Sequence, residues 1–567
     1  MSSVGQQYAS IEREPPVGGM PGSWEVSFHG GEVTWRDFFT GPLKLSDAEL
    51  ADITQQLLGM TWDEVPAAAA RELTPYSSSG VPVPALILHS ATSVLRSLEA
   101  DLIDTADGRC AEDVTTYVEA RSVCLARPGD LCVGRTLAWQ HQVEMAGVES
   151  VTIPGLAYYY LSHAILRLAA DTDGQAEPLR RIVAWLRARE EPLVCPYALD
   201  REYQVVLLYL KRLAHLDRLL MDANSPVIND VWNFKAPLYP RVDSAAGITA
   251  VNGDPFETLA AETALSPLSV QLGVEYVRVP GYTVVPDPDN PEVTAARLRH
   301  AARLLSSRYG LSRACLKPSG GSAGSRITTG VVLDGDLRWP RLAEQVHIAG
   351  TEYVLEADFD YAVTDIAGVP LQVMPSAHVR HGHVPDGVTL QIVDGTAWHG
   401  NIYLDAAAAP AAGLTAAEYQ AMLDTTESLR AAFEAVGHHL VTGGFDFAVG
   451  TVGGVFADHR FVAVQDPNLS SHGAEYLRLF LEQVLTAGLG PYAVTKVVRP
   501  HFAGTLAALR TAPPPPDSDF TTVISSVPGR WGMLAASGRS PGHALTTVLD
   551  YERQLLAGGL LVPIVPR

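Results

Sequence analysis

The chain has 567 residues, of which 47% are apolar and 18% charged, and its formal net charge is −22. These values are typical of a globular protein of about three or four domains, and the acidity argues against a general nucleic-acid or anionic-membrane partner. The five cysteines include no Cys-x-x-Cys pair, so neither a disulfide framework nor a zinc finger is indicated. No signal peptide and no apolar run of about 20 residues is evident, so we expect a cytoplasmic protein, by default a homodimer.

Residues 1–115 predict helices but carry no recognisable chemistry. Ser46 and Glu49 form a capping box at the start of one helix, and a second helix is expected over residues 90–103. We interpret residues 1–115 as an N-terminal extension of unknown function.

Residues 116–232 predict a first α/β domain. Two short strands are expected within residues 122–133, on either side of a Pro-Gly-Asp turn. Apolar residues at helical spacing predict helices over residues 156–170 and 202–220, and residues 226–228 are interpreted as a strand.

The most informative stretch follows a helix expected over residues 291–309. A short apolar run ends in Lys317, one of five lysines in the chain, and a loop of glycines and small residues comes directly after it. Glycine backbone can approach a ligand closely, its N–H groups can bind an anion, and the lysine adds a mobile charge suited to phosphate. Residues 326–333 then predict a strand, which excludes the Walker and Rossmann loops because both open a helix. We therefore predict a flexible phosphate-binding loop between two strands; the alternative is a Gly/Ser surface hairpin.

Three histidines follow a strand expected over residues 353–359. His378, His381 and His383 are bracketed by a predicted strand pair. His381 and His383 would share one face of a strand, which allows a zinc site, but no fourth ligand is evident. The alternative is a strand end that faces an anion or solvent.

The second informative stretch comes after a capped helix expected over residues 415–435. Residues 443–470 predict a hairpin in which Asp446 and Asp466 are equally far from the turn, so that the two carboxylates lie opposite each other on one face. Together with the amide of Asn468 they offer oxygen ligands of the kind that Mg²⁺ prefers. The alternative is a pair of solvated acids on an exposed hairpin.

Residues 517–567 predict a small C-terminal module behind the stiff linker of residues 513–516. A strand pair is expected over residues 521–527 and 531–536, and a helix over residues 543–556.

The order of these motifs resembles that of the ATP-grasp ligases. The resemblance implies an α/β (α+β) fold, with the ATP-grasp domain over residues 233–510, and it implies ATP and Mg²⁺ as cofactors. It also implies a set of roles: Lys235 and Lys317 on the nucleotide; Ser319, Gly320, Gly321, Ser322 and Gly324 in a lid loop of residues 317–326; Val354, Leu355 and Glu356 along the adenine; and Asp446, Asp466 and Asn468 on the metal.

Two further stretches are similar to the natural-product peptide ligases related to the pheganomycin ligase. Residues 121–130 are similar to the start of the pre-ATP-grasp domain of those proteins, and residues 529–541 are similar to their C-terminal module. The resemblance therefore implies a pre-ATP-grasp domain over residues 116–232 and spans about residues 116–560.

The hairpin departs from the family pattern, which usually ends in Glu-x-Asn-x-Arg. Here Asn468 is followed by leucine and serine, so the arginine that would steady an acyl phosphate is missing at its usual place. Arg380, Arg326 or His472 could replace it, and we favour Arg380.

The resemblance implies an ADP-forming ligase. A carboxylate would attack the γ-phosphate of ATP to give an acyl phosphate, and an amine would then capture it. The expected substrates are amino acids or peptides in natural-product biosynthesis, and no serine or cysteine nucleophile is required. Two alternatives are amino-acid loading of a carrier protein and a degenerate ATP-grasp module that binds nucleotide without catalysis.

Overall fold

The computed structural model describes residues 44–78, 83–90, 114–135, 137–154, 158, 160–245, 255–320, 327–335, 338–349, 351–395, 397–498, 501–502, 508–509, 511–527 and 531–562. The helix predicted over residues 90–103 lies outside these ranges beyond Ser90, and so do Gly321, Ser322, Gly324 and Arg326 of the predicted lid. In the described part of the chain, no helix is both long and apolar enough to cross a membrane.

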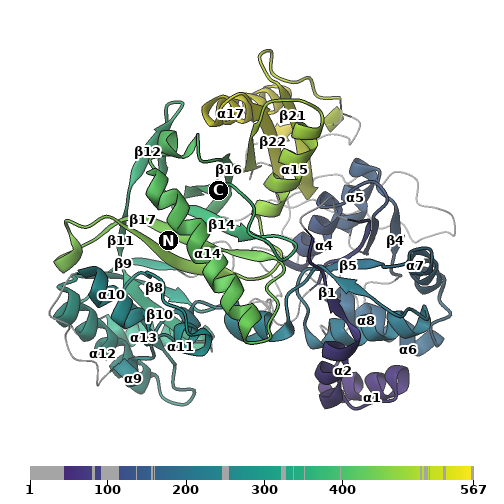
Figure 1. Ribbon diagram of the computed structural model, residues 1–567, viewed down its shortest axis with the longest axis horizontal. Coiled ribbons are helices and arrows are strands. Elements are labelled where there is room, and N and C mark those ends of the chain that lie inside the picture. The colour runs from purple at the N-terminus through teal and green to yellow at the C-terminus, as the bar shows by residue number, and fades with distance from the viewer. Residues whose placement is uncertain are drawn as a thin grey trace.

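The first body is a parallel sheet covered by helices on both faces, coloured purple to blue in Figure 1. Its strand order is β1 (Thr74–Pro75), β6 (Leu220–Met221), β5 (Leu193–Pro196), β2 (Ala85–Leu88), β3 (Leu131–Gly134) and β4 (Ser150–Thr152). The core on one face is built with α1 (Asp47–Leu58), α2 (Val65–Glu72), α6 (Leu161–Thr172), α7 (Glu177–Arg187) and α8 (Arg201–Leu213). The other face packs against α4 (Val114–Cys124) and α5 (Leu137–Ala146).

The sheet draws on the segment predicted as an N-terminal extension. β1 and β2 precede residue 115 and pair in parallel with β6, β5 and β3, so the predicted boundary at residue 115 passes through this sheet. The capping box of Ser46 and Glu49 is confirmed at the start of α1.

Two predicted strands are helical instead. Residues 122–124 belong to α4, where Val123 is buried in the core that contains Ile87 and Cys132 of the sheet. Residues 226–228 begin a helical segment that continues as a π-helix, η3 (Ile228–Trp232). Pro226 lies in its first turn, where a missing N–H costs no helical hydrogen bond. In both places a short apolar run was compatible with either structure, and the tertiary packing decided.

The second body contains two antiparallel sheets, drawn in teal and green in Figure 1 except for the last strands of the larger sheet, which are yellow. The smaller has the order β7 (Gly281–Val284), β10 (Tyr353–Ala357), β8 (Arg313–Pro318) and β9 (Thr328–Val332), with α12 (Pro291–Tyr309) and α13 (Trp339–Ala349) in the core on one face. β8 and β9 pair directly, which confirms the predicted strand–loop–strand around Lys317.

The larger sheet has the order β11 (Phe359–Tyr361), β17 (Gly443–Val452), β14 (Pro375–Val379), β15 (Val388–Asp394), β16 (Ala397–Leu404), β19 (Tyr492–Val498), β22 (Trp531–Gly538) and β21 (Phe520–Val527), and β18 (Phe461–Asn468) pairs with β17. The capped helix α14 (Ala416–Ala435) packs in the core with Phe445 and Phe447 of β17. The C-terminal hairpin of β21 and β22 therefore continues this sheet through β19. α15 (Ala474–Thr486) and α17 (Pro541–Ala557) pack on β19 and β22 in two separate cores.

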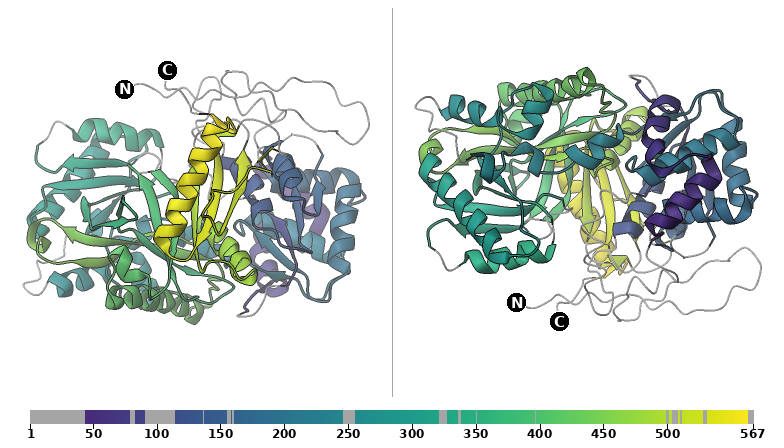
Figure 2. Two further views of the ribbon diagram at one scale, coloured as in Figure 1. Left: turned by 90° about the horizontal axis from the view of Figure 1, so that it is seen from above. Right: turned by 90° about the horizontal axis from the view of Figure 1, so that it is seen from below.

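Short elements complete the described fold: η2 (Trp62–Glu64), η4 (Ala236–Leu238), α9 (Val242–Ala245), α10 (Pro255–Thr263), α11 (Pro267–Leu272), the hairpin of β12 (Val363–Ile366) and β13 (Val369–Gln372), η5 (Ala409–Ala412), η6 (Gly454–Phe456), and the pair of β20 (His501–Phe502) and β23 (Leu561–Val562). Figure 2 shows the yellow C-terminal segment between the two bodies, in agreement with the contacts of β21 with α4 and α5. The predicted α/β (α+β) class is confirmed, with parallel and antiparallel sheets in one chain.

A buried ion pair joins the two bodies. Arg121 of α4 contacts the Glu475 carboxylate of α15, and the two side chains are 1% and 19% exposed. Burial alone would raise the pKa of Glu475, but Arg121 and neighbouring groups lower it to about 2. The pair therefore stabilises the fold above the unfolded pKa of 4.5, and this stabilisation is lost as the pH falls toward about 2.

We expect Glu475→Gln to lower the free energy of unfolding by about 3–5 kcal/mol at neutral pH, because the buried Arg121 loses its counter-charge. Urea unfolding of wild type and variant between pH 7 and pH 3 would measure the difference, which should shrink toward pH 3. Glu482→Gln on the exposed side of the same helix is the control and should cost less than about 1 kcal/mol. If the difference in unfolding free energy between wild type and Glu475→Gln does not change with pH, the Glu475 carboxylate is not the stabilising group.

Candidate functional site

Lys317 lies near the end of β8 and is held by a buried carboxylate. Its Nζ is 2.5 Å from Glu356 Oε1, and the two side chains are 9% and 1% exposed. Glu356 also accepts from the Tyr239 hydroxyl at 2.5 Å and from Gln465 Nε2 at 3.3 Å. Burial alone would lower the pKa of Lys317, but the Glu356 carboxylate outweighs this effect and raises it, so the ammonium is fully charged at neutral pH.

The strand expected along the adenine has two faces with different surroundings. Val354 packs in the core that contains Tyr239, whereas Leu355 packs against α12 on the opposite face of β10. Glu356 points to Lys317. Of these three residues, Leu355 can therefore contribute to a site on the Lys317 side only through its backbone.

The second lysine is tied to the same place by the chain itself. The backbone N–H of Lys235 donates to Ser319 O at 3.0 Å, and Ala236 N–H donates to Ser319 Oγ at 3.0 Å. A Cβ on Gly320 would lie 3.1 Å from the Phe234 ring, so the backbone approaches closely where the predicted lid begins. These contacts bring together two lysines that are far apart in the sequence.

The hairpin of β17 and β18 presents its polar side chains on one face. Asp446 pairs with Asp466, and Asn468 follows two residues later, as the spacing predicts. A register shift between Asp446 and Phe447 leaves this pairing in place. Asp446 accepts from Ser376 Oγ at 2.5 Å and from Asn468 Nδ2 at 2.8 Å.

The same hairpin meets the lysines. Lys235 Nζ is 2.9 Å from Asp466 Oδ2, and Gln465 beside it contacts Glu356, the partner of Lys317. One region between the two antiparallel sheets therefore contains two ammonium groups and the predicted oxygen ligands.

The donor set fits a hard cation. Burial, and then the charge of Asp466, raise the pKa of Asp446 to about 6, which means that the protein does not fully compensate two neighbouring carboxylates. Carboxylate and amide oxygens are ligands that suit Mg²⁺. Two carboxylates and one amide make up this donor set, and among all the described residues no group of three or more His, Cys, Asp or Glu side chains is arranged to hold a metal.

The three histidines do not converge. His378 contacts Thr389 Oγ1 at 3.0 Å, and His381 contacts Asp222 Oδ1 at 3.0 Å. His383 lies 3.3 Å from the Ser77 hydroxyl. Three separate partners leave no zinc site among these residues.

Two of the candidates for the missing arginine, Arg380 and His472, lie in the described part of the chain, and Arg326 lies outside it. Arg380, at the end of β14, pairs with Glu482, which also binds Arg127 at 2.9 Å. His472 stacks on His378 with 4.5 Å between ring centroids, and burial lowers its pKa to about 4, so it is neutral at pH 7. The structure therefore does not bring Arg380 to the acidic hairpin.

Arg380 instead lines a cavity between the two bodies, which we call the interdomain cavity. Its volume is about 70 Å³, and its lining includes Arg127, Asp222, His381 and Glu475. His89 also lines it, is 1% exposed, and has no hydrogen-bond partner for Nδ1 in the described structure. Ser471, three residues after Asn468, belongs to the same lining. The cavity thus begins where the acidic hairpin ends.

Four residues of this region escaped sequence analysis. Tyr239 and Gln465 hold Glu356, Ser376 binds Asp446, and Gln391 donates to Ser376 at 2.9 Å. Their only signal is a polar side chain within or beside an apolar run, which many surface strands share.

Asp446 makes stability depend on pH in a defined direction. Its folded pKa of about 6 lies above the ordinary value of 3.8, so the folded state binds the proton more tightly than the unfolded state. Without metal, the free energy of unfolding should therefore fall by up to about 3 kcal/mol as the pH rises from about 4 to about 6.

We expect Asp446→Asn to remove this decline. Chemical denaturation of wild type and variant in a chelating buffer between pH 4 and pH 7 would measure it. A difference between the two proteins that stays constant over this range would show that Asp446 is not the group responsible.

A scan against protein-family models and a search of curated proteins found no match. A search of solved structures found chains that are similar over most of this one. An ADP complex of purK, an N5-carboxyaminoimidazole ribonucleotide synthetase, is 11% identical, covers 84% of this chain and 98% of its own, and has a TM-score of 0.42.

Two further structures are similar in the same way. The biotin carboxylase domain of the Hydrogenobacter thermophilus 2-oxoglutarate carboxylase, in complex with MgADP, ADP and bicarbonate, is 13% identical, covers 79% of this chain and 88% of its own, and has a TM-score of 0.43. The D-cycloserine synthetase DcsG is 14% identical, covers 70% of this chain and 99% of its own, and has a TM-score of 0.29. At these identities and TM-scores the similarities assign neither a family nor a reaction.

Proposed function

We propose that this chain is an ATP-grasp ligase that joins a carboxylate to an amine, with ATP as the phosphoryl donor and ADP as a product. The observation that carries this proposal is the convergence of Lys235, Lys317, Asp446 and Asp466 in one region, although more than two hundred residues separate the first from the last. Two buried cations opposite two acids and an amide suit a nucleotide whose phosphates need both ammonium groups and a metal.

The chain's own residues supply charge and position. Lys235 and Lys317 would neutralise the phosphates, and the loop that starts at Ser319 and Gly320 would cover them. Asp446, Asp466 and Asn468 would hold Mg²⁺, which supplies charge neutralisation on the phosphates when bound. A reaction of this kind needs positioning more than a covalent nucleophile.

A substrate to be joined would reach the interdomain cavity with its charged end, because a volume of about 70 Å³ does not admit a whole amino acid. The cavity adjoins the hairpin at Ser471. Its lining includes two positive side chains, Arg127 and Arg380, and two negative ones, Asp222 and Glu475. Such a lining suits an amino acid or peptide, which carries a carboxylate and an amine. In this proposal Arg380 takes a substrate carboxylate.

The domain assignments belong to the same proposal. The parallel-sheet body would be the pre-ATP-grasp domain, extended by the strands and helices of residues 44–90. The peptide-ligase subfamily and a role in natural-product biosynthesis are proposed on the sequence resemblance alone. A homodimer is proposed only as the commonest state of soluble oligomers.

The experiment is an ADP-release assay with pairs of amino acids. The expected result is Mg²⁺-dependent ADP release that requires both a carboxylate and an amine acceptor, with a dehydrated conjugate detected by mass spectrometry. ADP release that needs only the carboxylate and labels an added carrier protein would favour carrier loading. If nucleotide binds but no pair of amino acids gives turnover, the chain is better explained as a degenerate ATP-grasp module without catalysis. The missing arginine after Asn468 supports that alternative.

A further inference from the structure

Three polar side chains form a connected row on one face of the larger sheet. Asp446 of β17 pairs with Ser376 of β14, and Ser376 lies opposite Thr389 of β15. Gln391 follows Thr389 by two residues, so it lies on the same face of β15 and is the diagonal neighbour of Ser376. We call Gln391, Ser376 and Asp446 the Asp446 row.

Hydrogen bonds run along the Asp446 row in one direction. Gln391 Nε2 donates to Ser376 Oγ at 2.9 Å, and Ser376 Oγ donates to Asp446 Oδ1 at 2.5 Å. A serine hydroxyl has one proton to donate, and an ionised carboxylate can only accept. The reversed amide of Gln391 would place a second acceptor on that proton, so only the orientation with nitrogen toward Ser376 satisfies both bonds. The Gln391 amide therefore commits the hydroxyl proton of Ser376 to Asp446.

The carboxylate of Asp446 is held at both oxygens. Ser376 donates to Oδ1, and Asn468 Nδ2 of β18 donates to Oδ2 at 2.8 Å. Ser376 is 2% exposed, and Gln391 and Asp446 are half-buried, so little water competes for these bonds. A rotation of the carboxylate would break at least one of them. Donors on the two strands that flank β17 thus fix the direction of both oxygens.

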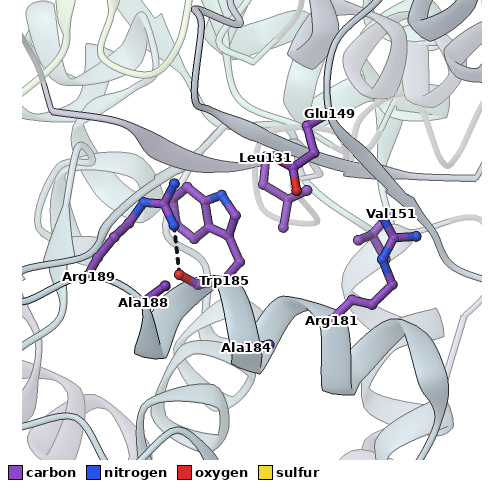
Figure 3. A pocket seen from close by; sticks show the side chains of 8 residues that line it. All are labelled: Leu131, Glu149, Val151, Arg181, Ala184, Trp185, Ala188 and Arg189. Carbon is purple, nitrogen blue, oxygen red and sulfur yellow. Dashed lines mark hydrogen bonds between the residues drawn. The ribbon is translucent and has the colours of Figure 1, made fainter.

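The arginines around the hollow beside α7 are held differently (Figure 3). Arg189 donates to the backbone oxygen of Trp185, and Arg181 donates to that of Ser150. These contacts end on the main chain. In the Asp446 row, by contrast, each side chain acts on the next, and the last one is a proposed ligand of the metal.

A carboxylate of fixed direction favours one kind of cation. Mg²⁺ requires a nearly ideal octahedron of ligands at about 2.0–2.1 Å, whereas Ca²⁺ accepts six to eight oxygen ligands at about 2.3–2.6 Å in flexible geometry. Loss of a partner that orients a metal ligand typically lowers metal affinity by about 10–100-fold. That loss should be larger for Mg²⁺, because Ca²⁺ can still bind a carboxylate that has turned.

We propose that Ser376 and Gln391 are positioning residues that make the site of Asp446 selective for Mg²⁺ over Ca²⁺. Ser376 orients the carboxylate, and Gln391 acts through Ser376. Neither side chain would touch the metal, whose ligands would be Asp446, Asp466 and Asn468. This role rests on the proposed function, because it takes Asp446 as a metal ligand, but it concerns the choice of metal and not the reaction.

The test is calorimetric titration of the full chain with ADP in three buffers, which contain excess Mg²⁺, excess Ca²⁺ or EDTA. In wild type we expect ADP to bind most tightly with Mg²⁺. Gln391→Met should weaken ADP binding about tenfold with Mg²⁺, should weaken it less with Ca²⁺, and should leave it unchanged in EDTA. A general loss of packing would change all three affinities alike, whereas a loss of positioning changes the ratio between them.

A second variant and a control place the effect in the Asp446 row. Ser376→Ala should shift the ratio of the Mg²⁺ and Ca²⁺ affinities in the same direction as Gln391→Met. The effect of Gln391→Met should be smaller in the Ser376→Ala background than in wild type, because the effects of coupled residues do not add. Thr389→Val is the matched control: Thr389 lies on the same face of β15, but its hydroxyl contacts His378 Nε2 at 3.0 Å, so the ratio should not change.

Equal losses with Mg²⁺ and Ca²⁺, or no loss, in Gln391→Met or in Ser376→Ala would overturn the proposal. Asp446→Asn separates this failure from a failure of the proposed function. If Mg²⁺ tightens ADP binding in wild type and Asp446→Asn abolishes that gain, the metal site stands and only the role of Ser376 and Gln391 falls. If Mg²⁺ does not tighten ADP binding in wild type, the proposed metal site falls as well.

Discussion

Lys317→Met is expected to abolish ATP-dependent turnover and to destabilise the fold. The variant removes a cation proposed to act on the phosphates, and loss of such a group lowers the rate by at least about 10²–10³-fold. It also leaves the Glu356 carboxylate, 1% exposed, without its counter-charge. Breaking a buried ion pair in this way costs about 3–5 kcal/mol. ADP release and chemical denaturation would measure the two effects.

A second variant separates function from stability. In Lys317→Met/Glu356→Gln no charge is left unpaired, and Tyr239 and Gln465 can still bind the amide that replaces Glu356. We expect this double variant to regain most of the stability and none of the turnover. Recovery of turnover together with stability would show that Lys317 serves the fold alone. Turnover in a folded Lys317→Met variant would contradict its role at the nucleotide.

Elements with local signals were predictable from the sequence. Capping boxes start α1 and α14, and Gly310 ends α12 in a left-handed conformation that favours glycine. The pairing of Asp446 with Asp466 followed from counting residues to a turn, because the side-chain period of a strand fixes the face. In each case the deciding contact lies within a few residues or across one hairpin.

Elements that depend on distant partners were not predictable in the same way. β1 and β2 join a sheet whose other strands come up to about 150 residues later, and β22 extends a sheet through β19. A sequence pattern shows that a strand is apolar but not which strand pairs with it. The boundary at residue 115, which came from the sequence resemblance, and the boundary in the proline linker of residues 513–516 therefore do not coincide with the edges of the sheets.

In the candidate site, too, local features were predictable from the sequence and contacts between distant elements were not. The sequence identified both lysines and the acidic hairpin, but not that Lys235 pairs with Asp466 or that Lys317 pairs with Glu356. Arg380 was favoured as the replacement for the missing arginine, yet its partner is Glu482 on α15. Which carboxylate forms an ion pair with a given lysine or arginine depends on the packing of separate elements.

The pairing of Lys235 with Asp466 leads to a prediction about the order of binding. Lys235 Nζ lies 2.9 Å from Asp466 Oδ2, on a side chain proposed to hold Mg²⁺. Free Mg²⁺ must displace this ammonium group, which is 10% exposed. A nucleotide would offer Lys235 its phosphates and release Asp466 for the metal. Metal and nucleotide should therefore bind cooperatively.

The expected result is weak binding of Mg²⁺ alone, and binding about 5- to 150-fold tighter in the presence of ADP, which is the usual range for coupled sites. Lys235→Met should bind Mg²⁺ alone at least about tenfold more tightly than wild type, because nothing competes for Asp466, and should bind ADP more weakly. Lys496→Met is the matched control, since Lys496 forms an ion pair of similar length with Glu552 at the C-terminal helix. Calorimetric titration would measure the affinities of wild type and both variants for Mg²⁺ and ADP. If Lys235→Met gains no affinity for Mg²⁺ alone, Lys235 does not compete with the metal, and cooperativity must arise from direct contact between the metal and the phosphates.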